Sequence, residues 1–142
     1  MEKVAERPTL ILVMRPLVTD ADNKRLRALL GTERVRGGAQ ARRLLREKLD
    51  VAAIVPFSRM PPSIVTMNSR VTCWDEKSMD RRELSLVYPW NAAPELGRIS
   101  VLSVPGVQLL GAAPAQLVRI DGALLRIYYV SYQPEASGHA HL

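Results

Sequence analysis

The spacing of apolar residues predicts a helix near the start of the chain. Leu26, Leu29 and Leu30 lie at positions i, i+3 and i+4, which places them on one face of a helix. Thr19 followed by Asp22 resembles a capping box, so the helix is expected to begin there. The glycine directly after Leu30 is expected to end it.

A second helix is predicted immediately downstream. The stretch 31–38 is polar and ends in a Gly-Gly pair, which predicts a turn, and a helical pattern follows over residues 39–50. The residues expected on its inner face are Ala41, Leu44, Leu45 and Lys48. Helices of roughly 11 residues rise only about 16 Å, and helices this short are marginal on their own. We therefore expect them to pack as a hairpin against the rest of the chain.

After a proline-rich stretch the apolar period changes from helical to alternating. Residues 65–73 alternate in the manner of a strand. The residues expected to point inward are Val65, Met67, Val71 and Cys73. Further strands are predicted at residues 82–88, 98–103, 117–120 and 123–132. Asp121-Gly122 joins the last two and is a strong signal for a two-residue hairpin turn.

One short helix is predicted within this sheet region, over residues 104–110, with Ser103 as its cap and Pro105 in its first turn. The tail from residue 133 onward lacks periodicity and is predicted to be loose. The pattern predicts an α+β protein with two parts. An N-terminal strand or arm and the short helical hairpin occupy residues 1–54, and an antiparallel sheet with one packed helix occupies residues 55–142.

Composition also indicates the cellular compartment of the protein. The 142 residues suit one domain of ordinary size. The single Cys73 excludes an internal disulfide and favours a reducing environment. The apolar run 10–14 is too short for a membrane span or a signal-peptide core, so we expect a cytoplasmic protein without a membrane segment. No long apolar edge demands a dimer, and a monomer is expected.

The positive charge is concentrated in the hairpin. The chain carries a net charge of +6, and residues 1–50 account for +5 of it. The hairpin arginines singled out as electrostatic candidates are Arg34, Arg36, Arg42 and Arg43. Such charge is either a solvated surface or a means of attracting an acidic surface or nucleic acid. Direct nucleic-acid recognition is disfavoured because the hairpin has no aromatic residue on which bases could stack, so nucleic acid is expected only as an indirect partner.

Residues suited to catalysis or metal binding are few. His139 and His141 form a pair without further nearby ligands, whereas zinc sites need four ligands, or three and a water. Cys73 lies in mid-strand without a nearby histidine, which favours a buried thiol over a nucleophile. No glycine-rich phosphate loop is present. We therefore expect no catalytic residue, no metal and no cofactor.

Several separated blocks of the sequence resemble the Rnk family, regulators of nucleoside diphosphate kinase that are related to the transcript-cleavage factors GreA and GreB. The blocks occupy residues 7–9, 63–71, 86–89, 99–101, 109–111 and 132–135. The resemblance implies a short antiparallel coiled coil followed by an FKBP-like domain. It also implies a partner, bacterial RNA polymerase, bound at the rim of its secondary channel.

The same resemblance speaks against transcript cleavage. Gre factors place paired acidic residues at the tip of a long coiled coil, where they help to hold a catalytic metal. The corresponding tip here has one carboxylate, Glu33, beside Arg34 and Arg36, on helices too short for that reach. We therefore expect no stimulation of cleavage.

A second family motif provides candidates for polymerase binding. Gre factors have a Ser-x-Asp-Ser-Pro run before their short helix, and the equivalent run here is residues 100–105. Ser100 and Ser103 match the motif, Leu102 replaces its Asp, and Pro105 comes one place late. The two serines are equally well explained as a strand end and a helix cap.

The leading hypothesis is therefore a non-enzymatic transcription regulator that binds RNA polymerase and competes with Gre factors. One alternative is a peptidyl-prolyl isomerase, suggested only by the FKBP-like fold, although this chain has few aromatic residues to line such a pocket. Another is indirect control of nucleoside diphosphate kinase levels, which the family name suggests.

Overall fold

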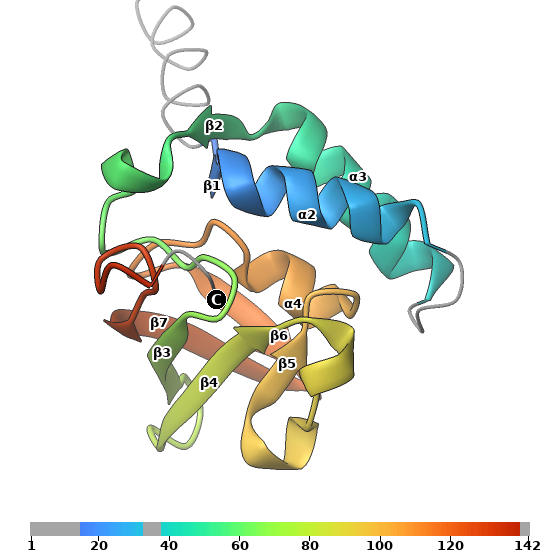
Figure 1. Ribbon diagram of the computed structural model, residues 1–142. Helices are drawn as coiled ribbons and strands as arrows, with labels where there is room; N and C mark the ends of the chain where they lie inside the picture. The colour runs from blue at the N-terminus through green and yellow to red at the C-terminus, as the bar shows by residue number, and fades with distance from the viewer. Residues whose placement is uncertain (1–14, 33–37, 140–142) are drawn as a thin grey trace, which may run out of the picture.

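The N-terminal part of the computed structural model is a pair of helices. The structure describes residues 15–32 and 38–139. Helix α2 (Asp20–Leu30) and helix α3 (Ala39–Val51) lie side by side as an antiparallel hairpin (Figure 1). Thr19 caps α2 as predicted, since its hydroxyl accepts a hydrogen bond from the Asp22 amide at 3.0 Å. The two helices confirm the predicted hairpin to within one residue.

A small parallel ladder closes the base of the hairpin. Strand β1 (Leu17–Thr19) pairs with strand β2 (Ala53–Val55). Arg15 reinforces this junction by donating hydrogen bonds to the carbonyls of Val51 and Ala52 at the end of α3. Three-residue strands contain too little alternation for the sequence pattern to reveal them.

The rest of the chain forms a curled five-stranded sheet in the order β5-β4-β3-β7-β6. Its strands are β3 (Arg70–Asp75), β4 (Arg81–Val87), β5 (Arg98–Ser100), β6 (Leu117–Ile120) and β7 (Ala123–Tyr132). All pairs are antiparallel except β4 and β5, which are parallel. The α+β class is confirmed, whereas a wholly antiparallel sheet is not. The turn at Asp121-Gly122 is confirmed, with positive φ at both residues.

Two predicted strands are shorter than expected. Residues 65–69 form a turn, in which Ser69 donates its amide to the Thr66 carbonyl and Asn68 has a φ of 65°. The predicted strand at 98–103 ends at Ser100, because the chain turns there into the next helix. Helix α4 (Val104–Leu109) is capped by the Ser103 hydroxyl, as predicted.

The start of the tail is ordered rather than loose. Gln133 is buried, and its side-chain amide donates to the carbonyls of Pro61 and Ile64, both at 2.8 Å. Its own carbonyl oxygen accepts from Ala136. Hydrogen bonds to loops distant in sequence have no periodic signature, so the pattern could not predict this anchor.

Three short 3₁₀ helices lie in the connections: η1 (Phe57–Arg59), η2 (Pro89–Asn91) and η3 (Pro94–Leu96). A single core joins the hairpin to the sheet. Leu26 and Leu45 from the hairpin belong to the same buried cluster as Leu86 and Leu109 from the sheet region. The hairpin therefore packs on the sheet through apolar contacts, as its short helices require.

Candidate functional site

The parallel pairing of β4 and β5 brings two loops to one edge of the sheet, facing the hairpin. β4 leads into Tyr88 and η2, while β5 leads into the loop before α4. The Val101 amide donates to the Val87 carbonyl at 2.9 Å, which holds the two exits together. Because the carboxyl ends of parallel strands lie at the same edge, this region gathers side chains from separate parts of the chain.

The four candidate polymerase-binding residues span the second of these loops, from Ser100 at the end of β5 to Pro105 in the first turn of α4. The Ser100 hydroxyl accepts from the Leu102 amide, and the Ser103 hydroxyl donates to the Ser100 carbonyl at 2.7 Å. Both serines therefore shape the loop. Leu102 is only 3% exposed and belongs to the core, so its side chain offers no surface to a partner. Ser100, Ser103 and Pro105 are half-buried and remain accessible in part.

The loop is also tight at Gly106. A Cβ atom at this position would collide with the carbonyl oxygen of Ser100 and lie 2.9 Å from the Cα of Val101. Only glycine lets α4 begin so close to the end of β5.

Two ionisable side chains hold the hairpin on the sheet part. Asp22 of α2 is buried, and its carboxylate accepts from the Met67 amide at 3.1 Å. The pKa of Asp22 is raised to about 6, mainly because burial disfavours the charged form; the hydrogen bond from the Met67 amide opposes this rise, and the nearby charge of Glu135 adds to it. Burial therefore disfavours the ionised form of this carboxylate at the junction.

Lys48 makes the second connection, from α3 to the end of α4. Its ammonium donates to the carbonyls of Val107 and Leu110, both at 2.6 Å, and to that of Gln108 at 3.3 Å. The last carbonyls of a helix have no partners within the helix, and a cation there satisfies them. Burial lowers the pKa of Lys48 to about 8. The predicted inner position of Lys48 therefore has a structural role.

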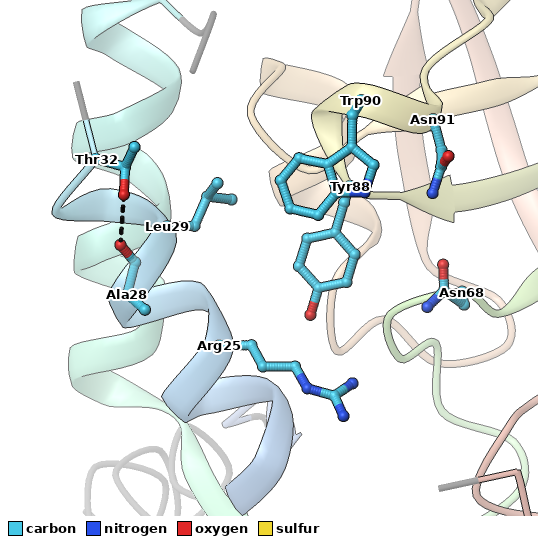
Figure 2. Close-up of a pocket in the computed structure, with 8 residues that line it drawn as sticks. All are labelled: Arg25, Ala28, Leu29, Thr32, Asn68, Tyr88, Trp90 and Asn91. Carbon is cyan, nitrogen blue, oxygen red and sulfur yellow. Dashed lines mark hydrogen bonds between the residues drawn. The ribbon is translucent and has the colours of Figure 1, made fainter. Parts of the chain in front are cut away.

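A groove opens between α2 and the segment after β4 (Figure 2). This α2 groove has a volume of about 670 Å³ and is mostly apolar. Its lining residues are Arg25, Ala28, Leu29, Thr32, Asn68, Tyr88, Trp90 and Asn91. Trp90 stacks flat on Tyr88, with ring centroids 5.1 Å apart, yet is 66% exposed. An aromatic side chain this open is available for a partner to cover.

Arg25 and Tyr88 give the α2 groove a polar end. Figure 2 shows the Arg25 guanidinium on the same side of the groove as the Tyr88 hydroxyl. Burial raises the pKa of Tyr88 to about 12, so the phenol stays protonated at neutral pH. A ligand here would meet one apolar wall and one cation.

A second groove lies between α3 and α4. This α3 groove has a volume of about 450 Å³. It is lined by Pro16, Leu44, Glu47, Lys48, Val51, Val104, Val107 and Gln108. The two grooves therefore border the hairpin where it meets the sheet part.

The hairpin arginines are divided between described and undescribed parts of the chain. Arg42 donates to the Thr32 carbonyl at 3.1 Å, and Arg43 forms an exposed pair with Glu47 at 3.9 Å. Arg34 and Arg36, like Glu33, lie outside the described residues. Exposed pairs of this kind contribute little to stability.

The other chemical candidates give no active centre within residues 15–32 and 38–139. No group of three or more His, Cys, Asp and Glu side chains suited to a metal occurs there. His139 Nδ1 lies 2.6 Å from the Tyr132 hydroxyl, and His141 is outside the described part. Burial raises the pKa of the Cys73 thiol to about 11, consistent with the predicted inert thiol. None of the described helices is both long and apolar enough to span a bilayer.

Sequence reasoning missed the α2 groove. Its residues come from α2, from the turn at Asn68 and from the Tyr88-Pro89-Trp90 segment, which are distant in the chain. The one available signal was the pair of aromatic residues around a proline directly after a strand, which is unusual in a chain this poor in aromatics.

Comparison with known proteins first defines the class. Residues 60–126 match the family model described as "Transcription elongation factor, GreA/GreB, C-term". A solved structure, the prokaryotic transcription elongation factor GreA/GreB from Nitrosomonas europaea, is similar to this chain with a TM-score of 0.70 at 32% sequence identity. The similarity covers 83% of this chain and 98% of that one. The fold is therefore that of a transcription-elongation-factor-like regulator.

Relatives that match over nearly their whole length identify the family within this class of protein. The "Regulator of nucleoside diphosphate kinase" of Escherichia coli (strain K12) is 31% identical over 137 residues, covering 93% of this chain and 96% of the relative. The Shigella flexneri protein of the same name matches equally well. The chain belongs to the Rnk family, the regulators of nucleoside diphosphate kinase.

Proposed function

We propose that this protein is a non-enzymatic transcription regulator that binds bacterial RNA polymerase at the rim of the secondary channel. It competes there with Gre factors without stimulating transcript cleavage. The observation that carries the proposal is a GreA/GreB-type fold whose hairpin helices are only 11 and 13 residues long.

The length of these helices limits what the hairpin can reach. At 1.5 Å per residue they extend about 16 and 20 Å. Catalysis of the Gre type needs paired oxygen ligands at the end of a long reach. This sequence has one carboxylate between residues 31 and 38, Glu33, and it is followed by Arg34. Binding without cleavage is the activity that such a hairpin supports.

The proposed contact surface comprises the α2 groove and the loop before α4, which follow the two paired strands β4 and β5. The apolar walls of the α2 groove provide area for a partner to bury. Trp90 is large and exposed, so its truncation is expected to cost the most binding free energy. Ser100 and Ser103 keep the loop in shape, and Pro105 lies beside them at the start of α4.

The test measures binding of the purified protein to core RNA polymerase, with GreA as competitor. We expect saturable binding, displacement by GreA, and no increase in RNA cleavage in backtracked complexes. Trp90→Ala should weaken binding about tenfold or more. Leu96→Ala, which removes an equally exposed apolar side chain from η3, should leave it unchanged. Absence of polymerase binding, or cleavage above background, would disprove the proposal.

No specific observation favours the alternative functions. All seven aromatic residues lie in the described part of the chain, but only Tyr88 and Trp90 line the α2 groove. An isomerase pocket with a dense aromatic lining is therefore not assembled there. Control of nucleoside diphosphate kinase levels is compatible with the proposal, because a change in transcription would produce it.

A further inference from the structure

The face of the five-stranded sheet that points away from the core carries an unexpected group of side chains. Val71 and Cys73 of β3 are buried in the core, so Arg70, Thr72 and Trp74 point to the opposite face. Figure 1 shows α2, α3 and α4 gathered on one side of the molecule, and α4 contributes Val107 and Leu109 to the core. We call the other side the open face.

Three aromatic side chains form a continuous row on the open face. The ring centroids of Trp74 and Tyr128 are 5.8 Å apart, and those of Tyr128 and Tyr129 are 5.2 Å apart. Tyr128 is 52% exposed and Tyr129 is 44% exposed. These rings do not contribute to the core, because the neighbouring residue whose side chain points into the core is Ile127.

An irregularity in the sheet produces this row. Cys73 pairs with Ile127, yet its neighbour Thr72 pairs with Tyr129, so Tyr128 is an extra residue in β7. A regular strand would turn one of two consecutive tyrosines inward. The bulge leaves both at the surface, and bulges often re-aim side chains at functional positions.

Arginines surround the aromatic row. Their pairing partners place the following five on the open face: Arg70, Arg81, Arg98, Arg119 and Arg126. The acidic side chains beside them are Glu76 and Glu83, so the local balance is positive. The part of the chain from residue 51 onward has a net charge of only +1, and this face holds five of its eight basic residues.

The arginines are arranged so that a ligand could engage them. The Arg81 guanidinium lies 5.2 Å from the centre of the Trp74 ring. Arg70 and Glu83 are 3.6 Å apart, with both side chains more than half exposed. Exposed ion pairs of this kind are weak, so a phosphate could replace the carboxylate at little cost.

We propose that the open face binds single-stranded nucleic acid. Bases would stack on Trp74, Tyr128 and Tyr129, and the surrounding arginines would contact phosphates. This combination of accessible rings and cations on one face of a sheet is the chemistry that single strands require, and about two or three bases would fit such a row. A protein partner would leave the arginines to be paired or buried, which costs free energy.

The test uses fluorescence anisotropy with the full chain and labelled oligonucleotides of about ten nucleotides: single-stranded RNA, single-stranded DNA and the matching duplex. We expect single strands to bind more tightly than the duplex, with affinity falling as salt rises. The RNA and DNA arms show whether the ribose hydroxyl matters. No polymerase is present, so this result is independent of the proposed function.

Variants locate the site. Tyr128→Ala and Tyr129→Ala should each weaken binding about 5- to 150-fold. Arg81→Gln should weaken binding and reduce the salt dependence. Two controls remove exposed side chains from other parts of the molecule: Ile54→Ala on β2 and Arg59→Gln on η1. Both should bind like the wild type, and circular dichroism melting would confirm that each variant is folded.

Three results would overturn the inference. The first is no binding of single strands at about 100 µM protein, the weak end of ordinary non-specific affinity. The second is a loss of binding in the control variants as large as that in the tyrosine variants. The third is a dimer in sedimentation that Tyr128→Ala disrupts, since the row would then be a contact between two copies.

Discussion

The junction between hairpin and sheet depends on two charged side chains that lie away from water. Asp22 accepts from the backbone of the turn before β3, and Lys48 donates to the carbonyls that end α4. Each charge is satisfied by backbone groups of the sheet part. A buried charge that loses its hydrogen bonds is costly, so both residues disfavour any other position of the hairpin.

Asp22 should make stability depend on pH in an unusual direction. Its folded pKa of about 6 lies above the ordinary value of 3.8, so the folded protein holds an extra proton between these values. The contribution of Asp22 to the free energy of unfolding therefore falls as pH rises from about 4 to about 6, by roughly 3 kcal/mol, and is constant above.

Urea unfolding at several pH values would measure this. Asp22→Asn should lose the decline between pH 4 and 6, because the amide does not titrate. The exposed neighbour Asp20 provides the control, since Asp20→Asn should keep the wild-type profile. An unchanged profile in Asp22→Asn would show that another group is responsible.

Lys48→Met should destabilise the fold by about 1–3 kcal/mol, because it leaves the carbonyls of α4 without their donor. Lys24→Met removes an exposed lysine from α2 and should change the free energy of unfolding by less than about 0.5 kcal/mol. Chemical denaturation of both variants at pH 7 makes the comparison. Equal stability of the two would contradict the role given to Lys48.

At the scale of elements, the edge that carries the candidate site depends on how closely α4 follows β5. Ser103 caps α4 and also bonds to the last residue of the strand. Gly106 lies against that same residue. The loop is therefore built by backbone contacts within seven residues, and its shape decides where the wall of the α3 groove stands.

Gly106→Ala should destabilise the protein by about 1–3 kcal/mol, because the new methyl group would overlap the Ser100 carbonyl and force the elements apart. Gly38→Ala is the matched control, since a Cβ there meets nothing within 4 Å. Thermal melting followed by circular dichroism would compare them. If both variants melted together, the contact at Gly106 would not be limiting.

Most helices and turns were predictable from the sequence, and the features that it missed share one cause. Both hairpin helices, α4 and the turn at Asp121 follow from local spacing and capping residues. The parallel pairing of β4 with β5 and the anchoring of Gln133 depend on segments far apart in the chain. Local patterns contain no information on such pairings, so the sequence predicted neither the one parallel pair in the otherwise antiparallel sheet nor the ordered start of the tail.

At the scale of the whole molecule, the length of the hairpin limits the range of the proposed activity. The described helices, of 11 and 13 residues, extend about 16 and 20 Å. The basic hairpin and the open face also lie on different parts of the molecule (Figure 1). Their charges can therefore serve different partners.

Arg34→Asp should leave the protein unable to stimulate transcript cleavage, although it places a second carboxylate next to Glu33. The reason is reach, since a metal-binding pair cannot act from too far away. Cleavage of backtracked RNA by core polymerase, with GreA as the positive control, measures this. Cleavage by the variant would show that the tip sequence, and not the helix length, is what prevents catalysis.

The candidate site itself was only partly readable from the sequence. Ser100, Ser103 and Pro105 were identified from the family motif, and in the structure they are half-buried between the end of β5 and the start of α4. Leu102 was identified in the same way but is buried, because the loop turns its side chain into the core. Which side chain of a loop faces outward depends on backbone turns that a motif does not specify.

The sequence alone determined the hairpin, its short reach, its basic character and the α+β class, because helix spacing, capping and alternation are local and depend on neighbouring residues. It also carried the likeness to the Rnk family. Only the tertiary structure decided that Lys48 and Asp22 connect the hairpin to the sheet part. It also decided that Trp90 lines a groove. The contact between Trp74, Tyr128 and Tyr129 on the open face was likewise decided only by the fold. These arrangements need contacts between residues separated by tens of positions, and only the folded chain brings such residues together.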